Sequence, residues 1–508
     1  MIDATLLLRL YARRRAARLA REDSAQAQQA QLIRLMRAAA DTRFGRAHEF
    51  AKIRSVADYQ ARVPVRRYED FWRDWWQASF PVLNEITWPG TIPFFAVTSG
   101  TTSGKTKYVP VSRAMNSANG RAALDLLTHH VMARPASRIL GGANFMLGGS
   151  TDLEQQARGI YSGDLSGIAA HSVPLWARSR FFPPRRYALM ADWERKIDTL
   201  ARLSLDADIR TLGGTPSWVL LLFERMAALV PDRPRRVTSW YPGLELFIHG
   251  GVNFAPYRAG FDAWFAGADV DRREVYAASE GFVAVADKGE GEGMRMIADN
   301  GIFYELVPVD EIASPTPTRH WLGNAETGVN YAIVLSTCAG LWSYVLGDTV
   351  RLVERTPPRL LVTGRLATML SAFGEHLIGE ELEAAIGAAA AAIDRAINDW
   401  TVTAIVPDSG GSGGRGRHLF VVEFAAPTDT DAVTHFAQAL DADLSARNLD
   451  YAAHRAGGFG LDAPMVKCAP PGTFAAWMKS RGMMGGQNKV PRVIRDASLF
   501  DSLVRAIP

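Results

Sequence analysis

The stretch Thr98-Ser99-Gly100-Thr101-Thr102-Ser103-Gly104-Lys105-Thr106-Lys107 follows a hydrophobic run and is crowded with hydroxyl groups. Hydroxyls donate hydrogen bonds to phosphate oxygens, and glycines let a backbone approach an anion closely. The spacing departs from the P-loop pattern G-x-x-x-x-G-K-[ST], because only three residues separate Gly100 from Gly104. The stretch therefore predicts a hydroxyl-rich clamp for nucleotide phosphates, with a plain surface turn as the alternative and a P-loop kinase as the least favoured interpretation.

The composition is that of a large globular protein. The chain has 508 residues, of which 48% are hydrophobic, and its formal net charge is +4. This length exceeds what one core usually holds, so two or more domains are expected. No long Lys/Arg cluster beyond the N-terminus points to nucleic acid. No run of about 18 apolar residues predicts a membrane span, and only two cysteines favour the reducing cytoplasm over a disulfide framework.

Hydrophobic patterning predicts an α/β fold. Residues 1–75 have helical spacing, and from about residue 92 short apolar runs alternate with helical segments. The expected strands cover residues 94–97, 144–147, 210–212, 245–249 and 274–277, and the expected helices cover residues 115–132, 187–203 and 217–229. Strand signals with short turns dominate residues 282–355, which predicts a β-rich subdomain.

After Pro357-Pro358 the pattern predicts a separate small α+β domain. An alanine run indicates a helix over about residues 380–398, and residues 401–406 and 419–424 resemble a strand pair. We place the boundary at Arg365, so the expected domains are residues 1–365 and 366–508.

Three further strand ends carry residues suited to a nucleotide. The paired glycines before Val252 leave a backbone edge against which a flat adenine can lie. Ser279 and Glu280 follow another strand, and a carboxylate beside a triphosphate can hold Mg²⁺, which prefers oxygen ligands. Asp348 follows a glycine turn and can accept hydrogen bonds from ribose hydroxyls. Each motif alone is weak, but the four in this order are specific.

In this order the motifs resemble those of the acyl-adenylate-forming superfamily, and most closely its Gretchen Hagen family of auxin-responsive acyl acid amido synthetases. The resemblance covers residues 98–107, 250–254, 276–280, 337–348, 364–365 and 485–492. It implies a large N-terminal adenylation domain with a β-barrel subdomain, joined by a hinge to a small mobile C-terminal domain. It also implies a two-step reaction, in which a carboxylate attacks the α-phosphate of ATP and an amine, usually of an amino acid, then attacks the acyl-AMP.

The resemblance implies roles for individual residues. The phosphates would be held by Ser99, Gly100, Thr101, Thr102 and Lys107, the adenine by Gly251, Val252 and Tyr276, the α-phosphate by Ser279 and the ribose by Asp348. Glu280 would bind Mg²⁺, and Arg365 and Lys489 would complete the catalytic set when the small domain closes. Because negative charge gathers at phosphorus in the first step, positioned donors and Mg²⁺ would supply most of the catalysis.

The acyl pocket is the least specific part of the sequence. The candidates for its lining are Arg121, Phe145, Met146, Trp218 and Phe254. The aromatic residues and the methionine would shape an apolar slot, and Arg121 would pair with a substrate carboxylate. Ordinary core packing and a solvated helix face explain the same residues at least as well.

Two departures from the family pattern keep alternatives open. Arg365 lacks the Asp that often follows three residues later, and the lysine that plant members carry after the hinge has no equivalent, because Glu375 and His376 occupy that segment. Lys489 is then the lysine candidate from the small domain. The alternatives to an amide-forming ligase are an adenylating enzyme with coenzyme A or a carrier thiol as acceptor, and a non-catalytic nucleotide sensor.

Overall fold

The computed structural model describes residues 3–99, 106–148, 153–173, 175–188, 190, 193–251, 254, 257–366, 370, 377–405, 416–448, 451–452, 455, 461–481, 490–494 and 496–507. The chain divides into two compact units. The first unit comprises Met1–Leu346 and Val350–Val362, and the second comprises Gly347–Thr349 and Thr363–Pro508. Across the described ranges, no helix combines the length and the apolar character that crossing a bilayer requires.

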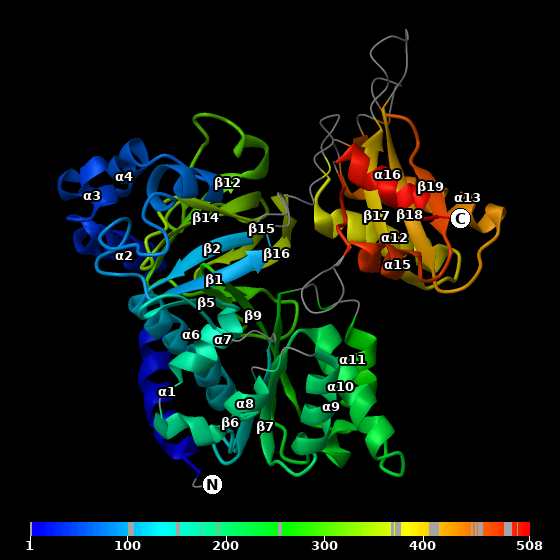
Figure 1. Ribbon diagram of the computed structural model, residues 1–508, viewed down its shortest axis with the longest axis horizontal. Coiled ribbons are helices and arrows are strands. Elements are labelled where there is room, and N and C mark those ends of the chain that lie inside the picture. The colour runs from blue at the N-terminus through cyan, green and yellow to red at the C-terminus, as the bar shows by residue number, and fades with distance from the viewer. Residues whose placement is uncertain are drawn as a thin grey trace. The chain divides into compact units, whose positions relative to one another are not determined.

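A sheet of 12 strands is the frame of the first unit (Figure 1). Its order is β13-β12-β14-β15-β16-β11-β10-β9-β8-β7-β3-β6. The strands from β6 to β9 are parallel neighbours. Their bounds are Phe181–Phe182 for β6, Ala143–Leu147 for β3, Ile209–Gly214 for β7, Leu246–Gly250 for β8 and Asp271–Ala278 for β9. These strands confirm the predicted α/β architecture.

At β10 the direction of pairing reverses, because β10 runs antiparallel to β9. The β-rich segment predicted over residues 282–355 forms this second half of the sheet. The bounds of its strands are Gly281–Val285 for β10, Met294–Met296 for β11, Ile302–Pro308 for β12, His320–Trp321 for β13, Asn330–Thr337 for β14, Tyr344–Arg355 for β15 and Pro358–Arg365 for β16.

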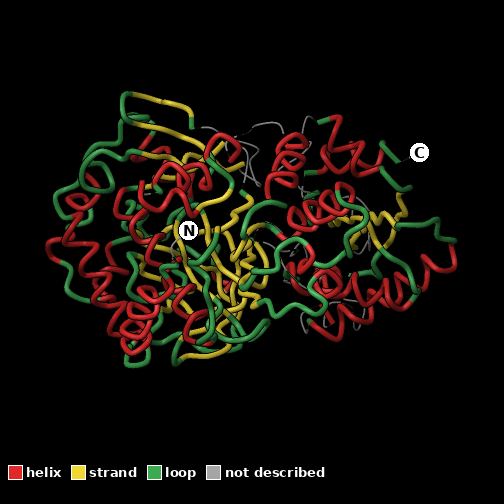
Figure 2. The backbone as a smooth tube through the Cα atoms, turned by 90° about the horizontal axis from the view of Figure 1, so that it is seen from below, coloured by secondary structure: helices red, strands yellow, loops and turns green. Residues whose placement is uncertain are grey.

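Helices cover both faces of the parallel half (Figures 1 and 2), as parallel sheets require. On one face the buried side chains Phe145, Leu212 and Phe247 pack against α9, α10 and α11. On the other face Leu246 packs with residues of α1 and α6. The helix bounds are Trp193–Ser204 for α9, Pro216–Leu229 for α10, Arg258–Trp264 for α11, Thr5–Leu19 for α1 and Arg113–Ala133 for α6.

Local sequence explains where these helices begin. The Ser112 hydroxyl accepts a hydrogen bond from the Met115 amide at the start of α6, and α10 begins with Pro216, whose missing N–H costs nothing at that position. The predicted helix 187–203 is α9, preceded by the short α8 (Arg185–Ala188).

A smaller sheet and an N-terminal helical layer complete the first unit. The sheet has the order β2-β1-β5-β4, and its antiparallel pair β1 and β2 holds the stretch that opens the sequence analysis. The bounds are Phe94–Ser99 for β1, Thr106–Val111 for β2, Glu154–Ala157 for β4, Ile160–Gly163 for β5, Ser24–Ala39 for α2, Arg43–Ala47 for α3, Val56–Arg62 for α4 and Tyr68–Phe71 for α5.

The second unit is a three-stranded sheet, β17-β18-β19, with helices. The antiparallel pair β17 and β18 confirms the predicted strand pair. The predicted helix 380–398 is too long, because α12 ends at Ala392 and Asp394 takes a left-handed φ of 50° that stops it. The bounds are Gly379–Ala392 for α12, Ile397–Ile405 for β17, Arg417–Phe424 for β18, Thr430–Arg447 for α13, Met465–Ala469 for β19, Thr473–Ser480 for α15 and Ala497–Arg505 for α16.

A buried ion pair ties the helical layer to the large sheet. The Glu305 carboxylate on β12 has no exposed surface, and it lies 2.8 Å from a guanidinium nitrogen of Arg319. The Ser343 hydroxyl, just before β15, donates a hydrogen bond of 2.8 Å to the same carboxylate. The Arg319 guanidinium also donates to backbone carbonyls of Gln60 and Val63, so the pair links α4 to the sheet.

We expect Arg319→Ala to lower the free energy of unfolding by about 3–5 kcal/mol, because it leaves the buried Glu305 carboxylate without its cationic partner. The measurement is urea denaturation followed by circular dichroism. The control is Lys52→Ala, which breaks an exposed pair with Glu49 and should cost less than about 1 kcal/mol. An Arg319→Ala loss no larger than that of the control contradicts the prediction.

Candidate functional site

The hydroxyl-rich stretch is the connection of a β-hairpin. Thr98 pairs with Lys107, and Ser99 pairs with Thr106. A P-loop leads from a strand into a helix, whereas this connection leads from β1 into β2. The hairpin is therefore a candidate phosphate-binding loop of a different kind from a P-loop. The predicted residues Gly100, Thr101 and Thr102, together with the Ser99 side chain, lie outside the described part of the chain.

Lys107 points toward the short helix α5. Its amine lies 5.1 Å from the centre of the Tyr68 ring and 3.5 Å from a carboxylate oxygen of Glu69. The Tyr108 amide donates a hydrogen bond of 2.8 Å to the Tyr68 hydroxyl oxygen, which joins α5 to β2. Burial raises the pKa of Tyr68 to about 12, so its phenol stays neutral. Neither Tyr68 nor Glu69 belongs to a recognisable sequence motif, and sequence reasoning missed both.

Glu280 lies in the turn between β9 and β10, where it is only 8% exposed. The hydroxyl of Tyr344, the first residue of β15, donates a hydrogen bond of 3.1 Å to its carboxylate. Burial and the nearby Glu280 charge hold the pKa of Tyr344 well above its usual value, so the phenol remains a donor. Glu69 and Tyr68 also raise the pKa of Tyr344 electrostatically. The centre of the Phe71 ring on α5 lies 6.1 Å from the centre of the Tyr344 ring, so the predicted residues Glu280 and Lys107 are connected through Tyr344 and α5.

Glycine is favoured at both positions at the end of β8, but for different structural reasons. A side chain at Gly250 would place its Cβ 2.2 Å from the carbonyl oxygen of Val275 on β9, so only glycine fits there. Gly251 has open space around it but takes a left-handed φ of 76°. Because β8 and β9 are parallel, the Gly251 turn and the turn that holds Glu280 lie at the same edge of the sheet. Val252 lies outside the described residues.

Two predicted neighbours of Glu280 differ in burial. Tyr276 on β9 is buried in the largest core cluster of the first unit, so its ring is part of the packing behind the turn. Ser279, which precedes Glu280 in the turn, is half-buried.

Asp348 and Arg365 belong to the second unit, where they pair. The Arg365 Nε lies 3.1 Å from an oxygen of Asp348, whose side chain is largely buried. The Thr363 hydroxyl donates to the Thr349 hydroxyl at 2.9 Å, which holds β15 and β16 together beside this pair. Lys489 lies outside the described residues.

The residues predicted for the acyl pocket do not gather in one place. Phe145 and Phe254 are buried in the aromatic core under α9, α10 and α11, and Trp218 packs against that core. Phe254 stacks on His249 with ring centroids 4.0 Å apart. Met146 points to the opposite face of β3, where it is 42% exposed and lies over Gly213. These positions favour a packing role for Phe145 and Phe254.

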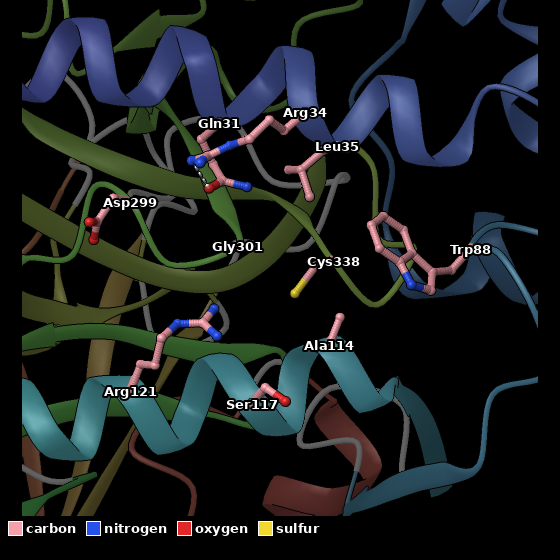
Figure 3. A pocket seen from close by; sticks show the side chains of 10 residues that line it. All are labelled: Gln31, Arg34, Leu35, Trp88, Ala114, Ser117, Arg121, Asp299, Gly301 and Cys338. Carbon is pink, nitrogen blue, oxygen red and sulfur yellow. Dashed lines mark hydrogen bonds between the residues drawn. The ribbon is translucent and has the colours of Figure 1, made fainter.

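Arg121 lines a separate cavity of about 290 Å³ between α2 and α6 (Figure 3). Its Nε donates a hydrogen bond of 3.1 Å to the Asn300 side chain. Arg34 and Cys338 lie around the same cavity (Figure 3). Burial raises the pKa of the Cys338 thiol to about 12, so it is a poor nucleophile.

Comparison with known proteins gives the family. Family models match as the GH3 family N-terminal domain over residues 13–270, the GH3 family central domain over residues 295–365 and the GH3 family C-terminal domain over residues 380–498. A probable indole-3-acetic acid-amido synthetase GH3.9 of Oryza sativa subsp. japonica is 24% identical over 249 residues, which are 45% of this chain and 55% of that protein. The matched segment therefore spans about half of that relative.

Solved structures show the same fold. A GH3.15 acyl acid amido synthetase superposes with a TM-score of 0.76 at 16% identity, covering 97% of this chain and 95% of that one. A 2-hydroxyisobutyryl-CoA ligase in the postadenylation state superposes with a TM-score of 0.60 at 17% identity, covering 96% and 94%. These likenesses confirm the predicted adenylate-forming fold, with a large N-terminal part and a smaller C-terminal part.

Alanine substitutions of Gly250 and Gly251 should lower the free energy of unfolding by different amounts. Gly250→Ala should cost about 3 kcal/mol or more, because its methyl group would meet backbone that cannot move away. Gly251→Ala should cost only about 1–2 kcal/mol, since the methyl group has room and only the left-handed φ is penalised. Thermal unfolding of the two variants gives the order, and an equal or smaller loss at Gly250 argues against this geometry.

Proposed function

Since the chain belongs to the GH3 family, we propose that it is an ATP-dependent acyl acid amido synthetase. It activates a carboxylic acid as acyl-AMP, releases pyrophosphate, and transfers the acyl group to an amine, an amino acid in the first instance. The observation that supports this most directly is the cluster in which Tyr344 orients the buried Glu280 while α5 holds Lys107. A sensor that only binds a nucleotide has no need of an oriented acidic side chain at this position.

The donor set of this cluster fits Mg²⁺. A carboxylate oxygen is a ligand that Mg²⁺ prefers. No group of three or more His, Cys, Asp or Glu side chains suited to a metal exists among the residues that the structure describes, so phosphate oxygens and waters would fill the remaining positions beside Glu280. When bound, Mg²⁺ would neutralise the phosphate charge that opposes attack by a carboxylate.

The other residues bind and orient the nucleotide in this proposal. Lys107 and the hairpin hydroxyls hold the β- and γ-phosphates, and Ser279 donates to the α-phosphate. The backbone at Gly251 lies against the adenine, with Tyr276 supporting it from the core. Asp348 accepts from the ribose hydroxyls while Arg365 orients that carboxylate through their ion pair.

Residues outside the nucleotide site would determine which acid and which amine bind. Met146 is exposed, and Trp218 packs against the aromatic core but is only partly buried, so these two remain the acyl-pocket candidates with accessible surface. Arg121 is a carboxylate ligand in this proposal only if the acid or the amino acid extends into the cavity of Figure 3. We keep the cytoplasm as the proposed compartment, supported by the two cysteines, which are both free.

The test is pyrophosphate release with ATP and Mg²⁺ across indole-3-acetic acid, 2,4-DB, benzoate and fatty acids, with amino acids or coenzyme A as acceptor. Indole-3-acetic acid enters the panel because the Oryza sativa relative is described as an amido synthetase of that acid, and 2,4-DB enters because a GH3.15 acyl acid amido synthetase has been solved in complex with it. Acid-dependent release that Glu280→Ala abolishes, and that amino acids accelerate, supports the proposal. Faster release with coenzyme A moves the chain to the thioester-forming alternative. ATP binding with no release for any acid supports a sensor.

Tyr344→Phe should lower acid-dependent pyrophosphate release about tenfold, since it removes one hydrogen bond to a charged group. The loss should shrink as Mg²⁺ is raised, because the variant leaves the Glu280 carboxylate in place and removes only a hydrogen bond that orients it. The matched control is Tyr241→Phe, which removes a buried hydroxyl that donates to Ser204 in the other core. Equal losses in both variants, independent of Mg²⁺, count against a role for Tyr344 at the site.

A further inference from the structure

The segment Arg66–Phe71, which contains α5, is fixed to both halves of the candidate site by hydrogen bonds. The Arg66 amide donates to the Ser343 carbonyl, and the Val345 amide donates to the Arg66 carbonyl, each at 2.9 Å. These two bonds clasp the chain on either side of Tyr344. On its other side α5 accepts the hydrogen bond from Tyr108, next to Lys107. The helix therefore has a defined position relative to both the Glu280 side and the Lys107 side.

Two residues of α5 hold Lys107 in different ways. The buried Tyr68 ring presents its face to the ammonium group, which orients the side chain without neutralising it. The Glu69 carboxylate neutralises the charge, but its side chain is 57% exposed, whereas the Lys107 side chain is 21% exposed. An ion pair this open is weak and easily exchanged, because water competes for the exposed partner.

A triphosphate carries more charge than one carboxylate and offers several acceptor oxygens, so it is the stronger partner for the same ammonium group. We propose that Glu69 is the resting counterion of Lys107, that nucleotide phosphates displace it, and that it takes Lys107 back when pyrophosphate leaves. Tyr68 keeps the side chain in place during the exchange. This inference rests on the proposed function, since it takes Lys107 as a phosphate ligand.

The exchange of Lys107 between Glu69 and phosphate predicts the direction in which removal of Glu69 changes nucleotide binding. If Glu69 competes with phosphate for Lys107, its removal strengthens binding of both ATP and pyrophosphate. If Glu69 merely supports the local structure, its removal weakens binding. The two roles therefore move the dissociation constants in opposite directions.

The experiment is equilibrium binding of Mg²⁺-ATP and of Mg²⁺-pyrophosphate to the full chain and to Glu69→Gln. We expect dissociation constants about two- to fivefold lower in the variant, the range that a partly exposed ion pair supplies. Stronger product inhibition by pyrophosphate should accompany the change. Glu49→Gln is the matched control, because it removes the same charge from another exposed pair, with Lys52, and should leave both constants unchanged.

A double-mutant cycle separates exchange with Lys107 from a general loss of negative charge. Lys107→Ala should weaken ATP binding about tenfold, and Glu69→Gln should then have no further effect. Unchanged or weaker binding by Glu69→Gln overturns the inference, and so does equal tightening with and without Lys107. Tightening without acid-dependent pyrophosphate release in the parent chain would sink the proposed function alone. A parent chain that binds no ATP contradicts both.

Discussion

The reversal of strand direction between β9 and β10 is the constraint on which the site depends. Up to β9 the strands of the large sheet are parallel, so the ends of β8 and β9 emerge at one edge. The chain then turns back through Ser279 and Glu280 into the antiparallel β10. Gly281 accepts a φ of 149° in this turn, and a Cβ there would meet Ile302 at 2.7 Å. A side chain at this position would strain the turn that carries Glu280.

A layered set of polar contacts supports that turn from behind. Tyr344 donates to Glu280, and its neighbour Ser343 donates to the buried Glu305, which Arg319 neutralises. Because buried charges tolerate little displacement once their partners are fixed, the backbone at Ser343 has little freedom. Orientation at Glu280 is thus a property of the whole antiparallel half of the sheet and not of one loop.

The charge pattern of the candidate site suits an anionic ligand that binds and is then released. Lys107 rests against an aromatic face and a partly exposed carboxylate, so its ammonium group is only weakly paired. Glu280 in contrast is buried and hydrogen-bonded. The candidate site thus combines a weakly paired ammonium group with a buried carboxylate that a hydrogen bond orients.

Sequence reasoning succeeded where the signal is local and weakened where it depends on packing. An apolar run ending in glycine located β8, and one followed by a hydroxyl and a carboxylate located β9. The order of motifs placed the chain in its family. The alanine run led to a helix that is six residues too long, since alanine itself carries no stop signal and the left-handed Asp394 is not recognisable beforehand. Phe145 and Met146 are neighbours with similar hydrophobicity, yet they point to opposite faces of β3.

The hairpin of β1 and β2 was decided by the tertiary structure. By itself the sequence indicated the fold class, the departure from P-loop spacing, and the candidate residues Glu280 and Lys107, because each depends on residue types within a few neighbouring positions. Only the tertiary structure decided which residues accompany them. Tyr68, Glu69 and Tyr344 meet the site through contacts between segments that are distant in the chain, and no periodicity or local motif encodes such contacts. The separation of Arg121 from the aromatic core was decided in the same way, by the sheet that lies between α6 and the α9–α11 layer.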